Sequence, residues 1–433
     1  EATSMIDSTS VLFGLEDEFV VTGLERLSKD DVRVVIEHRD REAPCPACGV
    51  LTSRVKERPL VRVKDLHACG QVIELWWRKR RLACPEALCA TRSFTQQSEA
   101  IPARARLTSR LRTALATEIA SGNRAVEEVA RTHGVSWPTA HRALVAAAAR
   151  WLPEPEPTKV LGIDETRARS VRWVLADAGW YRSDPWLTSF VDADTTGPGR
   201  MLGLAPGRSG ACVKDWINEQ SPEFRAAIEV VVIDTSAPYA SGVRAAVPDA
   251  KIAVDKWHLV ALANTMVTEV RQRVTRERYG RRGTTKERVW VNRQLLLTGY
   301  EHLSLKQRAR LKATLAGEDP TNEIGAAWGV KERLRLLLAE TDEHRIRHRL
   351  YEFYRDAARA DMPETTRLAT TIETWWPAIH VALTMKVTNA RTEGFNRIIK
   401  NTKRVACGFR NLENYQRRIL STIALTRARR DAA

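Results

Sequence analysis

The sequence predicts a multidomain protein built around a mixed α/β domain. A small cysteine-bearing β domain and a helical domain precede it, and a long helical segment follows its strands. Three observations support this fold class. Apolar runs bounded by turn residues recur after residue 158, Ala-rich helical spacing covers residues 107–151, and the pattern from residue 259 to about 380 is rich in Leu, Arg, Glu and Ala. The length of 433 residues allows about three domains at roughly 150 residues each.

The charge balance predicts a polyanionic partner. Lys and Arg number 69 and Asp and Glu number 53, which leaves a net charge of +16. Such a surplus favours nucleic acid over a membrane surface. No apolar run approaches the roughly 18 residues of a membrane helix, so we expect a soluble, intracellular protein with no membrane partner.

The first hundred residues predict short strands around a cysteine cluster. The run from Val32 to Ile36 and the run from Gln71 to Trp77 both read as strands. After the helical segment, residues 153–157 alternate Pro and Glu and form a stiff linker, which we take as the clearest domain boundary. Beyond it we expect five buried strands, namely Val160 to Ile163, Trp173 to Ala176, Trp186 to Val191, Val230 to Ile233 and Lys251 to Val254. Helices are expected at Val213 to Ile228 and at Tyr239 to Ala246.

Four of the seven cysteines have the spacing of a structural zinc site. Cys45 and Cys48 form a C-x2-C pair followed by Gly49, and Cys84 and Cys89 form a C-x4-C pair. Two such pairs complete a tetrahedral four-thiolate site, which is closed and therefore structural. Buried free thiols are the alternative, and His67 and Cys69 compete as ligands. The basic run beside the second pair suggests DNA contact through Arg78, Arg80 and Arg81.

Residues 127–142 follow the pattern of a helix-turn-helix. Ala130 stands where two helices cross closely, Gly134 stands at the turn, and Ser136 precedes the second helix. The early side chains of such a second helix lie in the DNA major groove. We therefore expect groove contacts from Trp137, Thr139, His141 and Arg142. A helical hairpin without a role in DNA binding is the alternative.

Three acids stand where catalytic carboxylates are expected. Asp164 and Asp234 each follow an apolar strand, and the carboxyl ends of strands are where open α/β sheets place their sites. Two neighbouring carboxylates make a site of hard oxygen ligands suited to Mg²⁺ or Mn²⁺. Glu393 is an isolated acid among basic and amide residues at the start of a helix. Each acid taken alone could be a helix cap or a salt-bridge partner.

Together these motifs resemble those of bacterial insertion-sequence transposases of the ISL3 family. The matching stretches include Gly162 to Glu165, Val232 to Tyr239 and Asp255 to His258, besides the four cysteines. Two more follow, residues 389–396 and residues 400–410. The resemblance implies an RNase H-like DDE catalytic domain with a helical insertion and assigns the catalytic roles to Asp164, Asp234 and Glu393. The separations are 234 − 164 = 70 and 393 − 234 = 159, and the second leaves room for the insertion.

With the resemblance, the expected domains are residues 5–100 for the strands and zinc site, 101–152 for the helix-turn-helix and 153–158 for the linker. The catalytic domain would comprise 159–258 and 388–430, with 259–387 as the insertion. Asp255 and His258 take supporting roles, and Asp255 is the alternative carboxylate to Asp234. Glu165 is expected to face away from the metals or to support them indirectly. Trp257 is expected to lie mainly in the core. Phosphate contacts are expected from Arg391, Arg397, Lys400, Lys403, Arg404 and Arg410.

The implied activity is cleavage and strand transfer at the terminal inverted repeats of an insertion sequence. Two Mg²⁺ (or Mn²⁺) ions and one structural Zn²⁺ would be the cofactors. The partners would be double-stranded DNA of the ends and of the target, and a second copy of the chain in a dimer or larger synaptic assembly. The location would be the bacterial cytoplasm, at the nucleoid. Two other functions remain open, a DNA-binding regulator with an inert nuclease-like domain and a structure-selective DNA nuclease.

Overall fold

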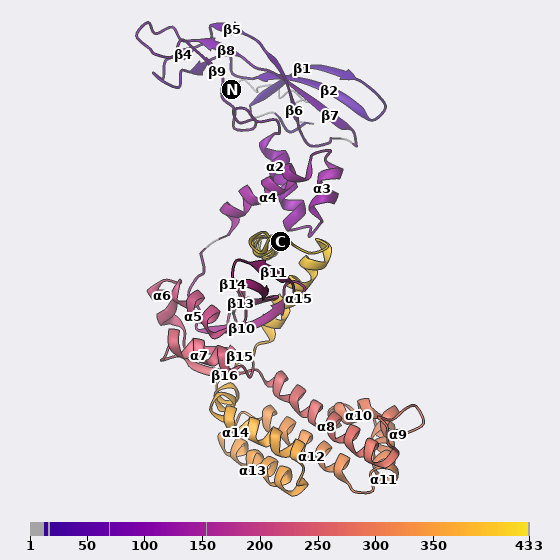
Figure 1. Ribbon diagram of the computed structural model, residues 1–433. Coiled ribbons are helices and arrows are strands. Elements are labelled where there is room, and N and C mark those ends of the chain that lie inside the picture. The colour runs from indigo at the N-terminus through magenta and orange to yellow at the C-terminus, as the bar shows by residue number, and fades with distance from the viewer. Residues whose placement is uncertain (1–12, 16–17, 69, 153, 432–433) are drawn as a thin grey trace, which may run out of the picture. The chain divides into compact units, whose positions relative to one another are not determined.

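The computed structural model describes residues 13–15, 18–68, 70–152 and 154–431. Within this part the chain forms two compact units (Figure 1). One combines the residues up to 152 with residues 404–431, and the other comprises residues 154–403. Outside the described residues lie Met5, where the first expected domain begins, Cys69, a competing zinc ligand, and Pro153 of the linker.

The first unit begins with a four-stranded sheet in the order β1-β2-β7-β6. Along β2 the side chains alternate, so Val32, Val34 and Ile36 are buried while their neighbours are partly exposed. They pack with Leu75 and Trp77 of β7 in one core. The four strands are β1 (Phe19–Arg26), β2 (Asp31–His38), β6 (Leu60–Lys64) and β7 (Val72–Arg78).

Two small sheets beside the first hold the cysteine pairs. The two-stranded sheet joins β3 to β4, and the three-stranded sheet has the order β5-β8-β9. Their strands are β3 (Ala43–Pro44), β4 (Leu51–Thr52), β5 (Val55–Glu57), β8 (Arg81–Ala83) and β9 (Ser93–Thr95). Sheets this small bury few apolar side chains, so an additional cross-link is needed to hold them.

Three helices and the C-terminal helix complete the first unit. Thr108 caps α2, since its side chain accepts a hydrogen bond from the backbone N–H of Leu111. The helices are α2 (Ser109–Ala120), α3 (Val126–Thr132), α4 (Trp137–Trp151) and α16 (Leu412–Asp431). Leu425 of α16 packs against the core of α2, α3 and α4. The C-terminal helix, which we expected in the catalytic domain, therefore packs with the helix-turn-helix.

The second unit is built on a five-stranded sheet in the order β14-β13-β10-β15-β16. β10 pairs antiparallel with β13 and parallel with β15, and β16 continues the parallel half. All four residues of β15 are buried, as expected for a central parallel strand. The strands are β10 (Val160–Arg167), β13 (Trp186–Asp192), β14 (Arg200–Pro206), β15 (Val230–Ile233) and β16 (Lys251–Val254).

Helices cover both faces of this sheet. One face packs on α5 (Gly210–Asn218), α6 (Pro222–Ala227) and α7 (Ala237–Ala246). The opposite face packs on Ala382 of α14 (Pro363–Thr384), while α15 (Ala390–Val405) lies against β10. The expected single helix from 213 to 228 is two helices, because the turn before Pro222 interrupts it.

A two-stranded hairpin between β10 and β13 corrects one prediction. The run Trp173–Ala176 forms β11 as expected, but it pairs only with β12 (Gly179–Arg182) and is exposed throughout. Its apolar composition predicted a buried strand. That prediction is wrong because no helix or sheet of the described chain covers this hairpin.

The helices after β16 have their own apolar core, formed mainly by Leu, Val and Ile side chains. α8 starts directly after Asp255 and ends at Gly280, whose φ of 68° is the left-handed conformation that glycine adopts readily. Figure 1 shows this helical bundle, whose members besides α14 are α8 (Lys256–Tyr279), α9 (Arg288–Val291), α10 (Arg293–Leu297), η1 (Tyr300–His302), α11 (Leu305–Glu318), α12 (Glu323–Ala339) and α13 (Glu343–Ala360). Among the described helices, none combines the length and apolar character needed to cross a membrane.

Candidate functional site

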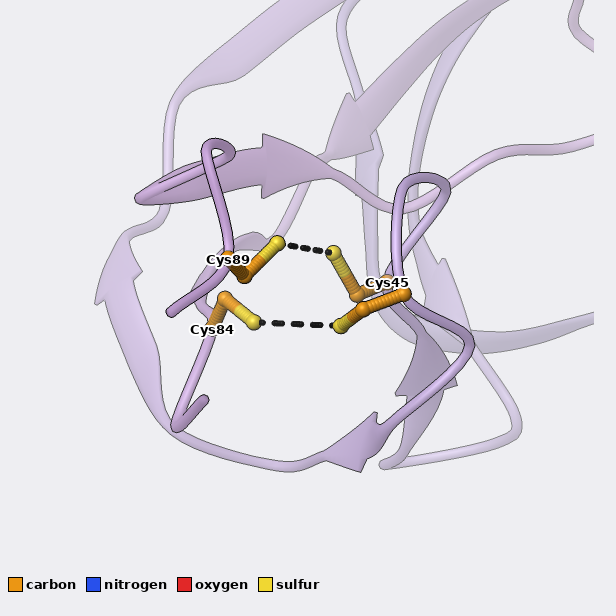
Figure 2. Close-up of side chains that lie close together, drawn as sticks. Cys45, Cys84 and Cys89 are labelled. Carbon is orange, nitrogen blue, oxygen red and sulfur yellow. Dashed lines mark hydrogen bonds between the residues drawn. The ribbon is translucent and has the colours of Figure 1, made fainter. Parts of the chain in front are cut away.

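The four predicted cysteines come together in the first unit. Sγ of Cys45 lies 3.8 Å from Sγ of Cys89, and Sγ of Cys48 lies 3.6 Å from Sγ of Cys84 (Figure 2). All four sulfur atoms lie within 4.8 Å of one another. Tetrahedral thiolates at about 2.3 Å from a zinc ion would be about 3.8 Å apart, so the observed spacing fits zinc.

Local backbone geometry prepares the first pair for metal binding. Gly49 has a φ of 73°, which permits the tight turn after Cys48. The backbone N–H of Ala47 lowers the pKa of the Cys45 thiol to about 7, which favours the thiolate that a metal requires. His67 is not part of the cysteine group and instead has its ring 6.0 Å from that of His133. Its competing role as a ligand is therefore unsupported.

The helix-turn-helix has the expected turn. Gly134 has a φ of 57°, and Ala130 is buried where α3 crosses the neighbouring helices. Ser136 precedes α4, but its hydroxyl contacts that of Thr139 at 2.9 Å and does not cap the helix backbone. Trp137 is 46% exposed and stacks on His141, with ring centroids 4.8 Å apart. Together with exposed Arg142, these side chains leave the start of α4 open for contact.

The acids Asp164 and Asp234 lie together at one end of the second unit's sheet. β10 pairs with β15 only from Val160 to Gly162, so Asp164 extends beyond the end of β15, where Asp234 follows Ile233. Carboxylate oxygens of Asp164, Glu165 and Asp234 lie within 4.8 Å of one another. Burial and the nearby Asp234 raise the pKa of Asp164 to about 7. A cluster of this kind is stabilised by a bound cation, and its oxygen donors suit a hard divalent metal.

The position of Glu165 is one that the sequence left open, since this residue was expected either to face away from the metals or to support them indirectly. Alternation along a strand places neighbouring side chains on opposite faces, which would direct Glu165 away from Asp164. Glu165 lies beyond the residues of β10 that pair with β15, and its carboxylate joins the cluster. Burial raises the pKa of Glu165. The sequence does not show that β10 pairs with β15 only from Val160 to Gly162.

Asp255 and His258 form the adjoining half of the site. Nδ1 of His258 lies 2.9 Å from Oδ1 of Asp234 and 3.2 Å from Oδ2 of Asp255. The contact with Asp234, and to a smaller degree that with Asp255, raises the pKa of His258 to about 10. Asp255 is 4% exposed and precedes α8, so the strand end and the helix start hold the pair rigidly. Trp257 beside them is 60% exposed, which corrects its expected place in the core.

The helix α15 is tied to the same strand through amide side chains. Nδ2 of Asn396 donates to Oδ2 of Asp164 at 2.6 Å, and Oγ of Ser189 donates to Oδ1 of Asn396 at 3.2 Å. Nδ2 of Asn389 donates to the carbonyl of Ile163 at 3.2 Å. Glu393 lies one turn before Asn396 on this helix and is exposed. Among the described residues, the carboxylate of Glu393 is not within ligand distance of the acidic cluster.

Gly162 allows α15 to lie against β10, and this predicts a stability effect. A Cβ atom at Gly162 would lie 2.8 Å from Oδ1 of Asn389 and even closer to Oγ1 of Thr392. Gly162→Ala should therefore displace α15 and lower the free energy of unfolding by about 1–3 kcal/mol, measured by chemical denaturation of the full chain. Gly329→Ala in α12 is the control, because nothing lies within 4 Å of its added Cβ and it should stabilise by about 0.5–1 kcal/mol. Equal effects of the two changes would contradict the close approach.

The predicted basic residues separate into internal and exposed groups. Arg80 is 7% exposed, and its guanidinium donates to the carbonyls of His38 and Asp40 and pairs with Glu37. Arg80 is therefore part of the fold and not of a DNA surface, which corrects that assignment. Arg391 likewise donates to the carbonyls of Asp194 and Gly197 and fixes the loop before β14.

The other predicted cations are available at the surface in differing degrees. Arg78 pairs with Glu37 at 3.1 Å, and Arg81 pairs with Glu57 at 3.6 Å, both as partly exposed ion pairs that contribute little stability. Nζ of Lys403 donates to the carbonyl of Arg167 at 3.2 Å. The exposed members are Arg397, Lys400, Arg404 and Arg410, the last two within the first unit.

Three family models match this chain. One is described as a transposase over residues 161–419, a span of 419 − 161 + 1 = 259 residues and thus more than half of the 433. A second is described as the zinc-finger of transposase IS204/IS1001/IS1096/IS1165 over residues 41–89. A third is the helix-turn-helix domain of transposase family ISL3 over residues 96–148. The chain belongs to the ISL3 family of transposases.

This transposase is also similar to one curated relative along most of its length. It is 25% identical over 374 residues to the transposase for insertion sequence element IS1001 of Bordetella parapertussis. The aligned residues cover 86% of this chain and 86% of the relative. The domains of the present chain are thus a zinc finger, a helix-turn-helix that binds DNA and a DDE domain. The zinc-finger match and the cysteine cluster indicate zinc, and the DDE family indicates a divalent metal in the transposase site.

Proposed function

We propose that this transposase binds the terminal inverted repeats of its insertion sequence and cleaves and joins DNA with two Mg²⁺ ions. The observation that carries the proposal is the carboxylate cluster of Asp164, Glu165 and Asp234 at the ends of two neighbouring strands. The amide hydrogen bond from Asn396 orients the Asp164 carboxylate. An inert regulator would not need three partly buried carboxylates in one cluster, which is costly without a bound cation.

Asp164, Asp234 and Glu393 would hold the two ions. When bound, the ions would activate the attacking hydroxyl and stabilise the leaving oxygen of the scissile phosphodiester. Glu393 lies three residues before Asn396 on α15, so the two side chains are neighbours on the helix, and metal binding would require the Glu393 side chain to turn toward the cluster. Asp255 and His258 support the site by holding Asp234 in place, and Asp255 is the alternative ligand.

Sequence recognition would belong to the first unit and phosphate contact to α15. Trp137, Thr139, His141 and Arg142 lie at the start of α4, where a recognition helix contacts base edges. The helix that carries Glu393 also carries Arg397, Lys400, Lys403 and Arg404. Arg78, Arg81 and Arg410 would add contacts to the DNA backbone. Phosphate contacts position the DNA without reading its sequence.

Transposition requires two element ends to be cut together, so we further propose a dimer or larger synaptic assembly. The activity acts on chromosomal DNA, and we propose a bacterial cytoplasmic location at the nucleoid. Both follow from the proposed substrate, double-stranded DNA of the ends and of the target.

The first test is cleavage of labelled DNA that carries the element's own ends, with Mg²⁺ or Mn²⁺. The expected result is a cut at the end sequence by the wild-type chain and none on DNA with scrambled ends. Binding of the ends without any cut would favour the regulator. Equal cutting of branched DNA without end sequences would favour the structure-selective nuclease.

Glu393→Gln should slow end cleavage by about 10²- to 10³-fold with unchanged end binding, because it removes a charge at the metal site but little volume. The measurement is the cleavage rate at saturating Mg²⁺ under single-turnover conditions. Glu219→Gln is the control, since Glu219 is an exposed acid of the same unit at the end of α5. A Glu393→Gln rate equal to that of the control would remove Glu393 from the proposed site.

A further inference from the structure

The hairpin of β11 and β12 presents an uncovered apolar face. Residues directly opposite in the hairpin are Trp173 with Arg182 and Leu175 with Trp180. Alternation along the strands places these four side chains on one side, which we term the Trp face. Trp173, Leu175 and Trp180 are 64%, 63% and 66% exposed. Contiguous exposed apolar side chains of this size mark an interaction site.

The charges around the Trp face favour a nucleic acid as the occupant. Arg167, Arg172 and Arg182 are exposed, and within the described part of the chain no carboxylate forms an ion pair with them. The acids of the segment are Asp177 at the turn and Asp184 at its base, and the carboxylate of Asp184 accepts a hydrogen bond from the backbone N–H of Trp186 at 2.8 Å. Aromatic side chains among arginines that have no carboxylate partner are typical of surfaces on which bases stack while phosphates are neutralised.

The hairpin is anchored to the catalytic strand. The backbone N–H of Ala168 donates to the carbonyl of Pro185 at 2.7 Å, and that of Ser183 donates to the carbonyl of Arg172 at 2.7 Å. These hydrogen bonds extend the antiparallel ladder of β10 and β13 into the hairpin. Arg167 lies three residues after Asp164 on β10, about 10 Å along the strand. The Trp face is thus connected to the acidic cluster by a short and ordered segment.

We propose that the Trp face stacks on unpaired bases of the DNA beside the scissile phosphate. The inference rests on the proposed function, because it assigns this surface to the DNA that the acidic cluster cuts. In this proposal the DNA is locally unstacked when it is cut, and indole rings that receive the displaced bases offset the cost of unstacking.

The test compares Trp173→Phe, Trp173→Leu and Trp180→Leu in the full chain on two labelled end substrates. One is fully paired, and the other has mismatches beside the cleavage site. On paired DNA, each Leu variant should cut roughly 5- to 150-fold more slowly than wild type, while the Phe variant stays close to wild type. On mismatched DNA, the Leu variants should recover most of the wild-type rate, because unstacking is no longer required.

Three outcomes would overturn the proposal. Equal rates of the Leu and Phe variants on paired DNA would mean that apolar character suffices and that a protein partner covers the face. A deficit that the mismatches do not relieve, with a changed mass in solution, would assign the face to a second copy of the chain. Wild-type rates in all variants would leave the face without a role in cleavage. Failure of the wild type to cut either substrate would instead contradict the proposed function.

Discussion

Asp164→Asn is expected to slow end cleavage by about 10³-fold or more without weakening end binding. The asparagine has nearly the same volume, and its carbonyl oxygen can still accept the hydrogen bond from Asn396. It lacks the negative charge that would hold a divalent metal beside Asp234. The measurements are the single-turnover cleavage rate and the Kd for end DNA, each at fixed salt because phosphate contacts make binding salt-dependent.

The same variant should be more stable than wild type when metal is absent. Burial and Asp234 raise the pKa of Asp164 to about 7, well above its value of about 3.9 in an unfolded chain. A carboxyl whose pKa rises on folding destabilises the fold when ionised, and this cost grows as the pH increases toward 7. The gain in Tm of Asp164→Asn over wild type, measured with chelator, should therefore be larger at pH 8 than at pH 5.

Asp249→Asn is the matched control for both measurements, since Asp249 is an exposed acid in the same unit. It should leave cleavage and Tm unchanged. An Asp164→Asn chain that cuts as fast as this control would remove Asp164 from the catalytic site. If the corresponding Asp234→Asn chain still cuts, Asp255 becomes the carboxylate to test.

Cys84→Ser is expected to reduce bound zinc from about one ion per chain to nearly none and to abolish specific end binding. The four sulfur atoms are spaced for one tetrahedral ion, and the small sheets that carry them have little other core. Structural zinc contributes an apparent binding free energy of about 10–16 kcal/mol, so its loss should unfold this part of the first unit. Zinc content by elemental analysis and end binding by gel shift measure the two effects.

Cys407→Ser is the control for the zinc prediction, because Cys407 is exposed and outside the four-cysteine group. It should retain both zinc and end binding. A strong chelator applied to the wild type should reproduce the Cys84→Ser result. Unchanged zinc stoichiometry in Cys84→Ser would contradict the four-cysteine assignment.

The local sequence pattern predicted the positions of strands in this sheet more reliably than their burial. The runs Val230–Ile233 and Lys251–Val254 form β15 and β16 within the expected bounds. β12 and β14 were not predicted, because Gly179, Gly203 and Pro206 interrupt the apolar alternation on which such predictions depend. The burial of Trp173–Ala176 was wrong for a related reason, since apolar composition does not distinguish a core strand from an uncovered hairpin.

The sequence by itself determined the ligand types and the chemical classes of the sites. Cysteine pairs at fixed spacing and an acid directly after an apolar strand are local patterns whose chemistry does not depend on distant contacts. The tertiary structure alone decided which side chains share a site and which already have hydrogen-bond partners within the protein. The sheet brings Asp164 and Glu165 to Asp234, Gly162 allows α15 to lie against β10, and the carbonyls of His38 and Asp40 engage Arg80. These outcomes depend on contacts between residues far apart in the chain, and no local spacing encodes them.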